Sequence, residues 1–266
     1  MEMIGYIAAA FIGISLGLIG GGGSILTLPV LVYLFGIPPG LATSYSLFIV
    51  GATSLIGAAG SFKRKQVDVR VALLLGVPAI VTVFITRRLL IPALPLNLFY
   101  ISDVPVTREL ATMLLFAALM LTASVFMIRG RQPVAEIPAG PMNGSKQAAL
   151  AGYGIGIGLV TGLLGAGGGF LIIPALILLA RLPMKKAVGT SLLIMTLSTG
   201  IGFMGDAALP DIHWPLLLAI TAIAVAGIVV GGKLATRIGS QQLKTAFGWF
   251  VLAMGIYVIV LETVFK

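Results

Sequence analysis

Long apolar stretches alternate with short polar connections along almost the whole chain. Most of these stretches have about 20 residues, which is the length of a helix that crosses roughly 30 Å of hydrocarbon. Two of them, 24–36 and 169–181, are shorter at about 13 residues and would not cross that thickness without tilting. The pattern predicts an all-α polytopic membrane protein whose apolar segments are 3–19, 24–36, 41–61, 69–91, 107–128, 147–164, 169–181, 187–205, 214–235 and 244–264.

The composition supports a membrane protein. Hydrophobic residues make up 59% of the chain and charged residues 9%, whereas soluble domains carry about 25% charged residues. The first segment has no basic region in front of it and no small-residue cleavage site after it, so we interpret it as a membrane helix. The chain has no cysteine, which excludes disulfides and thiolate metal sites.

One glycine-rich stretch occurs twice. Gly20–Pro29 has the sequence GGGGSILTLP, and Gly165–Pro174, 145 residues later, has the sequence GAGGGFLIIP. A polar segment rich in proline and glycine separates the two copies. Because an internal repeat organises a whole fold, we predict a first transmembrane repeat over 1–128, a cytoplasmic linker over 129–146 and a second transmembrane repeat over 147–266.

Loop charges predict how the two repeats are oriented. The loop Lys63-Arg64-Lys65 is basic and is expected in the cytoplasm, whereas the corresponding loop 205–213 has no lysine or arginine and is expected outside. Both assignments hold if each repeat starts with a glycine-broken hairpin followed by three spans, and if the repeats are inverted. Arg87, Arg88 and Arg108 argue against this arrangement, because they flank a loop that has to be external. Inverted repeats of about five segments are typical of secondary transporters.

The glycine stretches are also the main candidate binding site. Glycine is unfavourable inside helices, so two clusters at matching places predict the tips of two broken helices. Free N–H groups and the positive end of the helix dipole at such tips would hold an anion. Alternatively, the glycines only allow helices to pack closely. The candidate substrate-binding residues at the tips are Gly20, Gly21, Gly22, Gly23, Ser24, Gly165, Gly167, Gly168 and Gly169.

Hydroxyl side chains form a second candidate layer. Thr43 and Ser44 lie early in the third segment of the first repeat, and Thr190 and Ser191 lie early in the third segment of the second. We predict that these four add hydrogen bonds to a bound anion. The alternative is that they bond to backbone carbonyls of their own helix, as most serines and threonines in membrane helices do.

The remaining polar residues predict no catalysis. Charges lie at segment ends, and the single histidine, His213, borders the loop expected outside, where a structural role is favoured over proton coupling. No triad, paired-carboxylate site or metal-ligand cluster stands out. We therefore expect no catalytic residue, no cofactor and no metal. Scattered basic residues argue against nucleic-acid binding.

The paired glycine motifs, together with Ala187–Leu192 (AVGTSL), resemble the sulfite exporter TauE/SafE family, also called the toluenesulfonate uptake family. The resemblance covers nearly the whole chain. It implies a multi-pass permease of the bacterial inner membrane that moves sulfite, sulfonates, thiosulfate or related small anions. The first repeat departs from the small-residue pattern, because Thr86-Arg87-Arg88 stands where the second has Gly231-Gly232-Lys233.

These observations predict a secondary transporter that carries a small sulfur-containing anion by alternating access and is not an enzyme. Its other partners would be the lipid bilayer and, if transport is coupled to an ion, a proton or sodium; the sequence leaves the coupling open. Two alternatives stay open: an anion channel of similar architecture, and a membrane subunit or scaffold that transports nothing. The residues leave the exact substrate, the direction of transport and the oligomeric state open.

Overall fold

The computed structural model describes residues 2–21, 23–95, 97–101, 104–129, 144–165, 167–206, 212–235 and 240–264. The predicted helical architecture is confirmed, because each apolar run coincides with a helical segment to within a few residues. The first half contains α1 (Glu2–Ile19), α2 (Ser24–Pro29) with the π-helical turn η1 (Val30–Leu34), α3 (Pro39–Lys63), α4 (Val69–Ile85) with the π-helical turn η2 (Thr86–Leu90), α5 (Ile91–Ala93) and α6 (Arg108–Arg129). The second half contains α7 (Gly144–Leu164), α8 (Gly169–Leu178), α9 (Met184–Asp206), α10 (Trp214–Leu234) and α11 (Ser240–Val264).

Six helical segments among the described residues are long and apolar enough to cross a membrane. They are Pro39–Lys63, Val69–Ala93, Arg108–Val125, Gln147–Leu164, Met184–Asp206 and Trp214–Leu234. Met3–Ile19, Ser24–Leu34 and Val251–Leu261 are apolar but shorter. The chain is therefore built as a multi-pass membrane protein.

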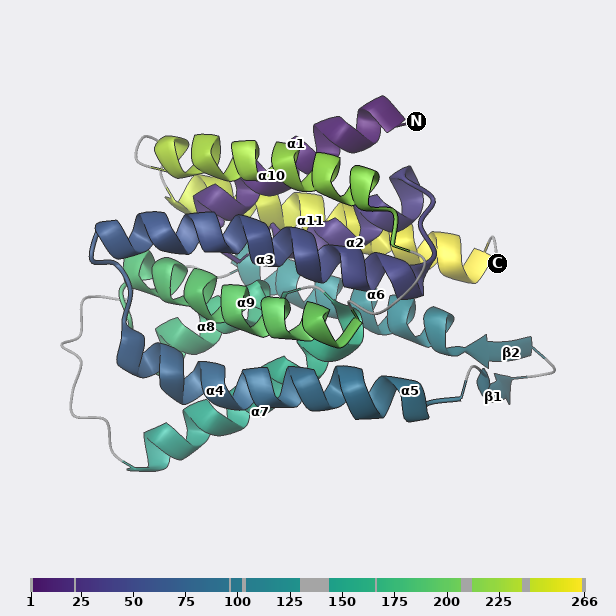
Figure 1. Cartoon of the computed structure of the whole chain (residues 1–266), viewed down its shortest axis with the longest axis horizontal. Helices are drawn as coiled ribbons and strands as arrows, with labels where there is room; N and C mark the ends of the chain where they lie inside the picture. The colour runs from purple at the N-terminus through teal and green to yellow at the C-terminus, as the bar shows by residue number, and fades with distance from the viewer. Residues whose placement is uncertain are drawn as a thin grey trace.

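The helices lie side by side along the long axis of the molecule (Figure 1). A small antiparallel hairpin of β1 (Asn97–Ile101) and β2 (Val104–Thr107) extends from one end of the bundle. We call this the hairpin end; α1 and α3 begin there, and α9 finishes there. The turn between α3 and α4 lies at the opposite end. The sequence predicted only a loop between α4 and α6, so the hairpin is an addition to the all-α prediction.

Helix packing repeats with the two halves exchanged. α1 packs on α10 and α7 packs on α4, while α3 packs on α9. A side chain at Gly13 of α1 would overlap the carbonyl oxygen of Ala224, and one at Gly158 of α7 would overlap that of Ala79. The two glycines are 145 residues apart in sequence, and so are the two alanines. Small residues thus let two corresponding helix pairs, α1 with α10 and α7 with α4, pack with their backbones close together.

The start of α4 and the start of α10 are capped at corresponding positions. The Asp68 carboxylate accepts a hydrogen bond from the Val71 N–H at 3.1 Å, and His213 Nδ1 accepts one from the Leu216 N–H at 3.3 Å. Side chains in such places satisfy N–H groups that the helix itself leaves unpaired. His213 thus has the structural role that the sequence favoured.

The same two capping residues also bond to α9 and α3. The backbone N–H of Asp68 donates to Thr190 Oγ1 at 2.9 Å, and that of His213 donates to Tyr45 Oη at 2.6 Å. Each bond joins a helix start in one half to a helix of the other half. The starts of α4 and α10 are therefore fixed to α9 and α3.

Close packing by glycine predicts unequal effects of two substitutions on α7. Gly158→Ala should lower the free energy of unfolding by about 1–3 kcal/mol, because its Cβ would overlap Ala79. Gly156 is exposed, and a Cβ added there would have nothing within 4 Å, so Gly156→Ala should be neutral or stabilising by up to about 1 kcal/mol. Thermal unfolding of both variants in detergent checks this. Equal melting temperatures would contradict the packing role of Gly158.

Candidate functional site

The two glycine tips meet inside the bundle. A side chain at Gly21 would overlap the backbone of Gly169, and one at Gly169 would overlap Gly21 Cα. The tip residues that the structure describes are all buried; Gly22 lies outside the described residues. Two stretches that are far apart in sequence thus form one contact, in which backbone touches backbone.

Glycine is required where α1 and α7 end. Gly20 has φ +83° and Gly165 has φ +66°, a left-handed conformation that side-chain-bearing residues rarely adopt. Their N–H groups donate to the carbonyls of Leu16 and Thr161 at 2.8 and 2.9 Å, which closes the last turn of each helix. The glycine stretches therefore stop both helices at corresponding positions.

Each tip lies against the third segment of the other half. A side chain at Gly20 would lie 2.7 Å from Cγ1 of Val188 in α9, and one at Gly165 would overlap Thr43 in α3. The Ser191 hydroxyl donates to the Val188 carbonyl at 2.8 Å and is fully buried. Thr43 of the first hydroxyl pair thus borders the second tip, whereas the first tip meets Val188, two residues before Thr190.

The hydroxyl groups differ in how they are used. Ser24, Thr43 and Ser191 donate to backbone carbonyls, those of Gly21, Gly40 and Val188, as the alternative interpretation expects. Thr190 accepts from Asp68, so it is engaged at the turn before α4. Four buried hydroxyls have no hydrogen-bond partner among the described residues: Thr27, Ser46, Ser54 and Thr161.

Thr161 was missed by the sequence analysis, although its hydroxyl borders the second tip. A side chain at Gly168 would overlap Thr161 Oγ1. The corresponding residue of the first half is Leu16, so the duplication places an apolar side chain there and gave no signal. The first tip has a hydroxyl neighbour of its own, because a side chain at Gly23 would overlap Ser15 Oγ.

Arg87 is the other residue that the sequence did not single out. The sequence predicted that Arg87 borders an external loop, but the residue lies in η2, which continues α4 to Leu90. Arg87 is 5% exposed, while its neighbour Arg88 is exposed. π-helical turns inside helices are frequent at functional sites. An ionisable residue buried within a membrane span is itself a candidate functional group.

Arg87 belongs to a polar network that includes two predicted site residues. Its Nη1 donates to Asp206 Oδ2 at 2.7 Å and to Thr43 Oγ1 at 3.1 Å. The Ser44 hydroxyl donates to the same Asp206 oxygen at 2.6 Å. The network joins α3, α4 and α9 at the hairpin end. Thr43 and Ser44 therefore act in a charged layer, whereas Thr190 and Ser191 lie apart from it.

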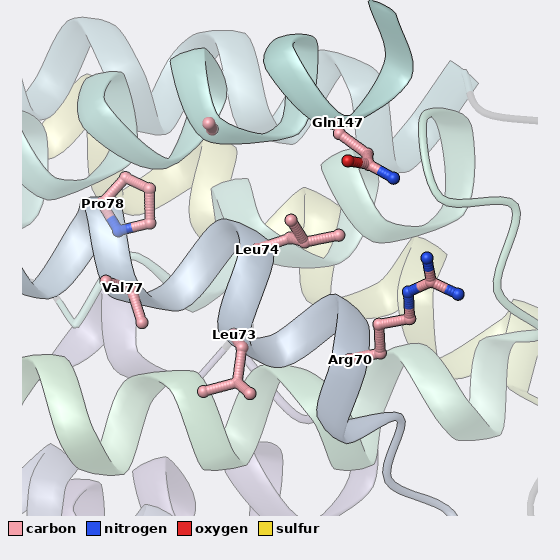
Figure 2. A pocket seen from close by; sticks show the side chains of 7 residues that line it. Arg70, Leu73, Leu74, Val77, Pro78 and Gln147 are labelled. Carbon is pink, nitrogen blue, oxygen red and sulfur yellow. The ribbon is translucent and has the colours of Figure 1, made fainter. Parts of the chain in front are cut away.

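A groove on the outer face of the bundle does not contain the predicted site. Figure 2 shows it between α4 and α7, with a volume of about 540 Å³. Its lining residues are Arg70, Leu73, Leu74, Val77, Pro78, Gln147 and Ala151. Among the described residues, no group of three or more His, Cys, Asp or Glu side chains could hold a metal ion.

Comparison with known proteins identifies the family. The model of the sulfite exporter TauE/SafE family matches residues 6–258. A probable membrane transporter protein of Xylella fastidiosa (strain 9a5c) is 31% identical over 95% of this chain and 92% of its own length. The probable membrane transporter proteins YdhB and YunE of Bacillus subtilis are 26% and 30% identical, over 88% and 86% of this chain and 91% and 85% of their own lengths.

No solved structure matches the chain. The family match covers nearly the whole sequence, and the helices that could span a membrane agree with it. The chain is a multi-pass membrane transporter and belongs to the sulfite exporter TauE/SafE family.

Proposed function

We propose that this transporter is a secondary carrier that moves a small sulfur-containing anion, such as sulfite, a sulfonate or thiosulfate, across the bacterial inner membrane by alternating access. The observation that carries the proposal is the contact between the two glycine tips at Gly21 and Gly169, deep in the bundle. The description of the family as sulfite exporters supports a sulfur oxyanion as the class of substrate. A proton or sodium ion would provide the driving force.

Repeated contacts support two inverted repeats of five segments. The Gly13–Ala224 and Gly158–Ala79 contacts are the same contact with the halves exchanged. α1 starts at the hairpin end, whereas α7 starts at the opposite end (Figure 1). In transporters of this plan, the substrate site lies where the repeats meet and discontinuous helices point at it. If the two repeats exchanged their conformations, the site would open first to one side of the membrane and then to the other.

The start of α8 supports binding of an anion at the tips. Within the described residues, the N–H groups of Gly169 and Phe170 donate to no backbone carbonyl. Such groups carry the positive end of the helix dipole, and glycine lets an oxyanion approach the backbone without a Cβ in the way. Because Gly21 and Gly169 now touch, the tips have to separate before an anion can enter.

Hydrogen bonds join three helices at the hairpin end. α3 is bonded there to both α4 and α9, through Thr43 with Arg87 and through Ser44 with Asp206. Entry of an anion from this end would require these bonds to break. Bonds that break and re-form in each cycle fit a carrier better than a channel, which needs both ends open at once.

Counterflow in proteoliposomes tests the carrier mechanism. The purified chain, reconstituted with unlabelled sulfite inside, should accumulate radiolabelled sulfite transiently from outside and should saturate as sulfite concentration rises. A channel would give flux without counterflow. Absence of any sulfite flux from correctly folded protein would instead favour a subunit or scaffold role.

Crowding of the second tip should slow transport strongly. Gly168→Ala would force Cβ onto Thr161 Oγ1, and displacement at a positioned site should lower the sulfite transport rate roughly tenfold or more. Gly36→Ala is the matched control, because Gly36 has a similar φ of +68° but nothing within 4 Å. It should transport at nearly the wild-type rate. Wild-type transport by both variants would refute the tip site.

A further inference from the structure

One edge of the Arg87 guanidinium is buried and unused. Nη1 bonds to Thr43 and Asp206, but Nε and Nη2 have no hydrogen-bond partner among the described residues. A guanidinium has five N–H donors, so three stay without a partner in a side chain that is almost fully enclosed. Buried donors without partners are costly and rare, which indicates a place where a ligand supplies the acceptors.

The unused edge has a specific chemical complement. Nε and Nη2 present parallel N–H groups in a fixed fork, and this fork matches two oxygens of a carboxylate, sulfonate, sulfite or similar group. We propose that the Nε–Nη2 edge of Arg87 is the binding site for the oxyanion group of the transported ion, which it holds by two parallel hydrogen bonds. The inference rests on the proposed function and names the residue that recognises the charge of the substrate.

The position of Arg87 connects this site with the glycine tips. Thr43 accepts a bond from Nη1 and also lies against Gly165 of the second tip. One residue before Arg87, the side chain of Thr86 packs against α7, where a side chain at Gly162 would lie 2.7 Å from Thr86 Cβ. Arg87 is thus connected to the second tip through Thr43, and its guanidinium is a cationic donor, whereas the backbone N–H groups are neutral donors.

Asp206 limits how tightly the site binds. Its carboxylate occupies Nη1 and is held there by the Ser44 hydroxyl, so the Arg87–Asp206 pair carries no net charge. An anion on the other edge therefore experiences repulsion from Asp206 as well as attraction to Arg87. This balance admits an anion that can make both hydrogen bonds and still allows its release.

The test measures binding of sulfite and of methanesulfonate to the full chain in neutral detergent by isothermal titration calorimetry. Removal of Arg87 alone would leave Asp206 as an unpaired buried charge, so the main variant is the double substitution Arg87→Gln with Asp206→Asn. Its Kd should rise at least about tenfold, because a bidentate charge-assisted contact is lost. Arg87→Lys keeps the charge but loses the fork, so its Kd should lie in between.

Two further variants complete the comparison. Arg88→Gln removes the exposed neighbouring charge and should bind with the wild-type Kd. Asp206→Asn should bind several-fold more tightly, because the repulsion is removed while Arg87 stays. Size-exclusion chromatography verifies folding, and if the double variant does not fold, weaker binding by Arg87→Lys than by Arg88→Gln decides the question.

The outcomes distinguish failure of the Arg87 site from failure of the proposed carrier function. If the wild type exchanges sulfite in counterflow and the folded double variant binds and exchanges equally well, the Arg87 site is wrong and the proposed function stands. A wild type that neither binds nor exchanges these anions would overturn both. Addition of phosphatidylglycerol distinguishes a lipid headgroup from a free anion: the lipid should leave sulfite binding unchanged, and loss of binding would overturn the assignment to a free anion.

Discussion

The hydrocarbon interior of a membrane offers no water to a broken helix, so every unpaired backbone group has to be enclosed by protein. This constraint explains the arrangement around the glycine tips. Gly21 and Gly169 cover each other, while α3 and α9 cover both tips from the sides. Among the candidate spans, α3 and α9 have the largest buried share, 67% and 61%, whereas the others have 28–39%. α3 and α9 thus enclose the glycine tips at which the helices are interrupted.

A second constraint is the burial of charge, and here the two halves differ. The first half places Arg87 in a π-helical turn and neutralises it with Asp206 of the other half. The second half has Gly231 and Gly232 at the corresponding places, and Gly231 lies against the backbone of Ile14. In the first half, this position is therefore stabilised by an ion pair and hydrogen bonds. In the second half, the corresponding position is stabilised by close packing of backbone against backbone.

Much of the fold was predictable because hydrophobic length and glycine placement are local signals. The apolar runs located the helices, and the duplicated glycine stretch located the tips. Burial of Arg87 was not predictable, since the residue that neutralises it, Asp206, lies 119 positions away in the other half of the chain. The separation of Thr190 from Thr43 and Ser44 was also hidden, because it depends on hydrogen bonds between residues more than 100 positions apart, such as Asp68 with Thr190.

The bonds at the helix starts join α4 and α10 to helices of the other half of the chain. The N–H of His213 holds the start of α10 to Tyr45 of α3, and the N–H of Asp68 holds the start of α4 to Thr190 of α9. A rigid-body movement that keeps these bonds carries α10 with α3 and α4 with α9. In such a movement each mechanical unit would combine helices from both halves of the chain, and would not follow the order of the sequence.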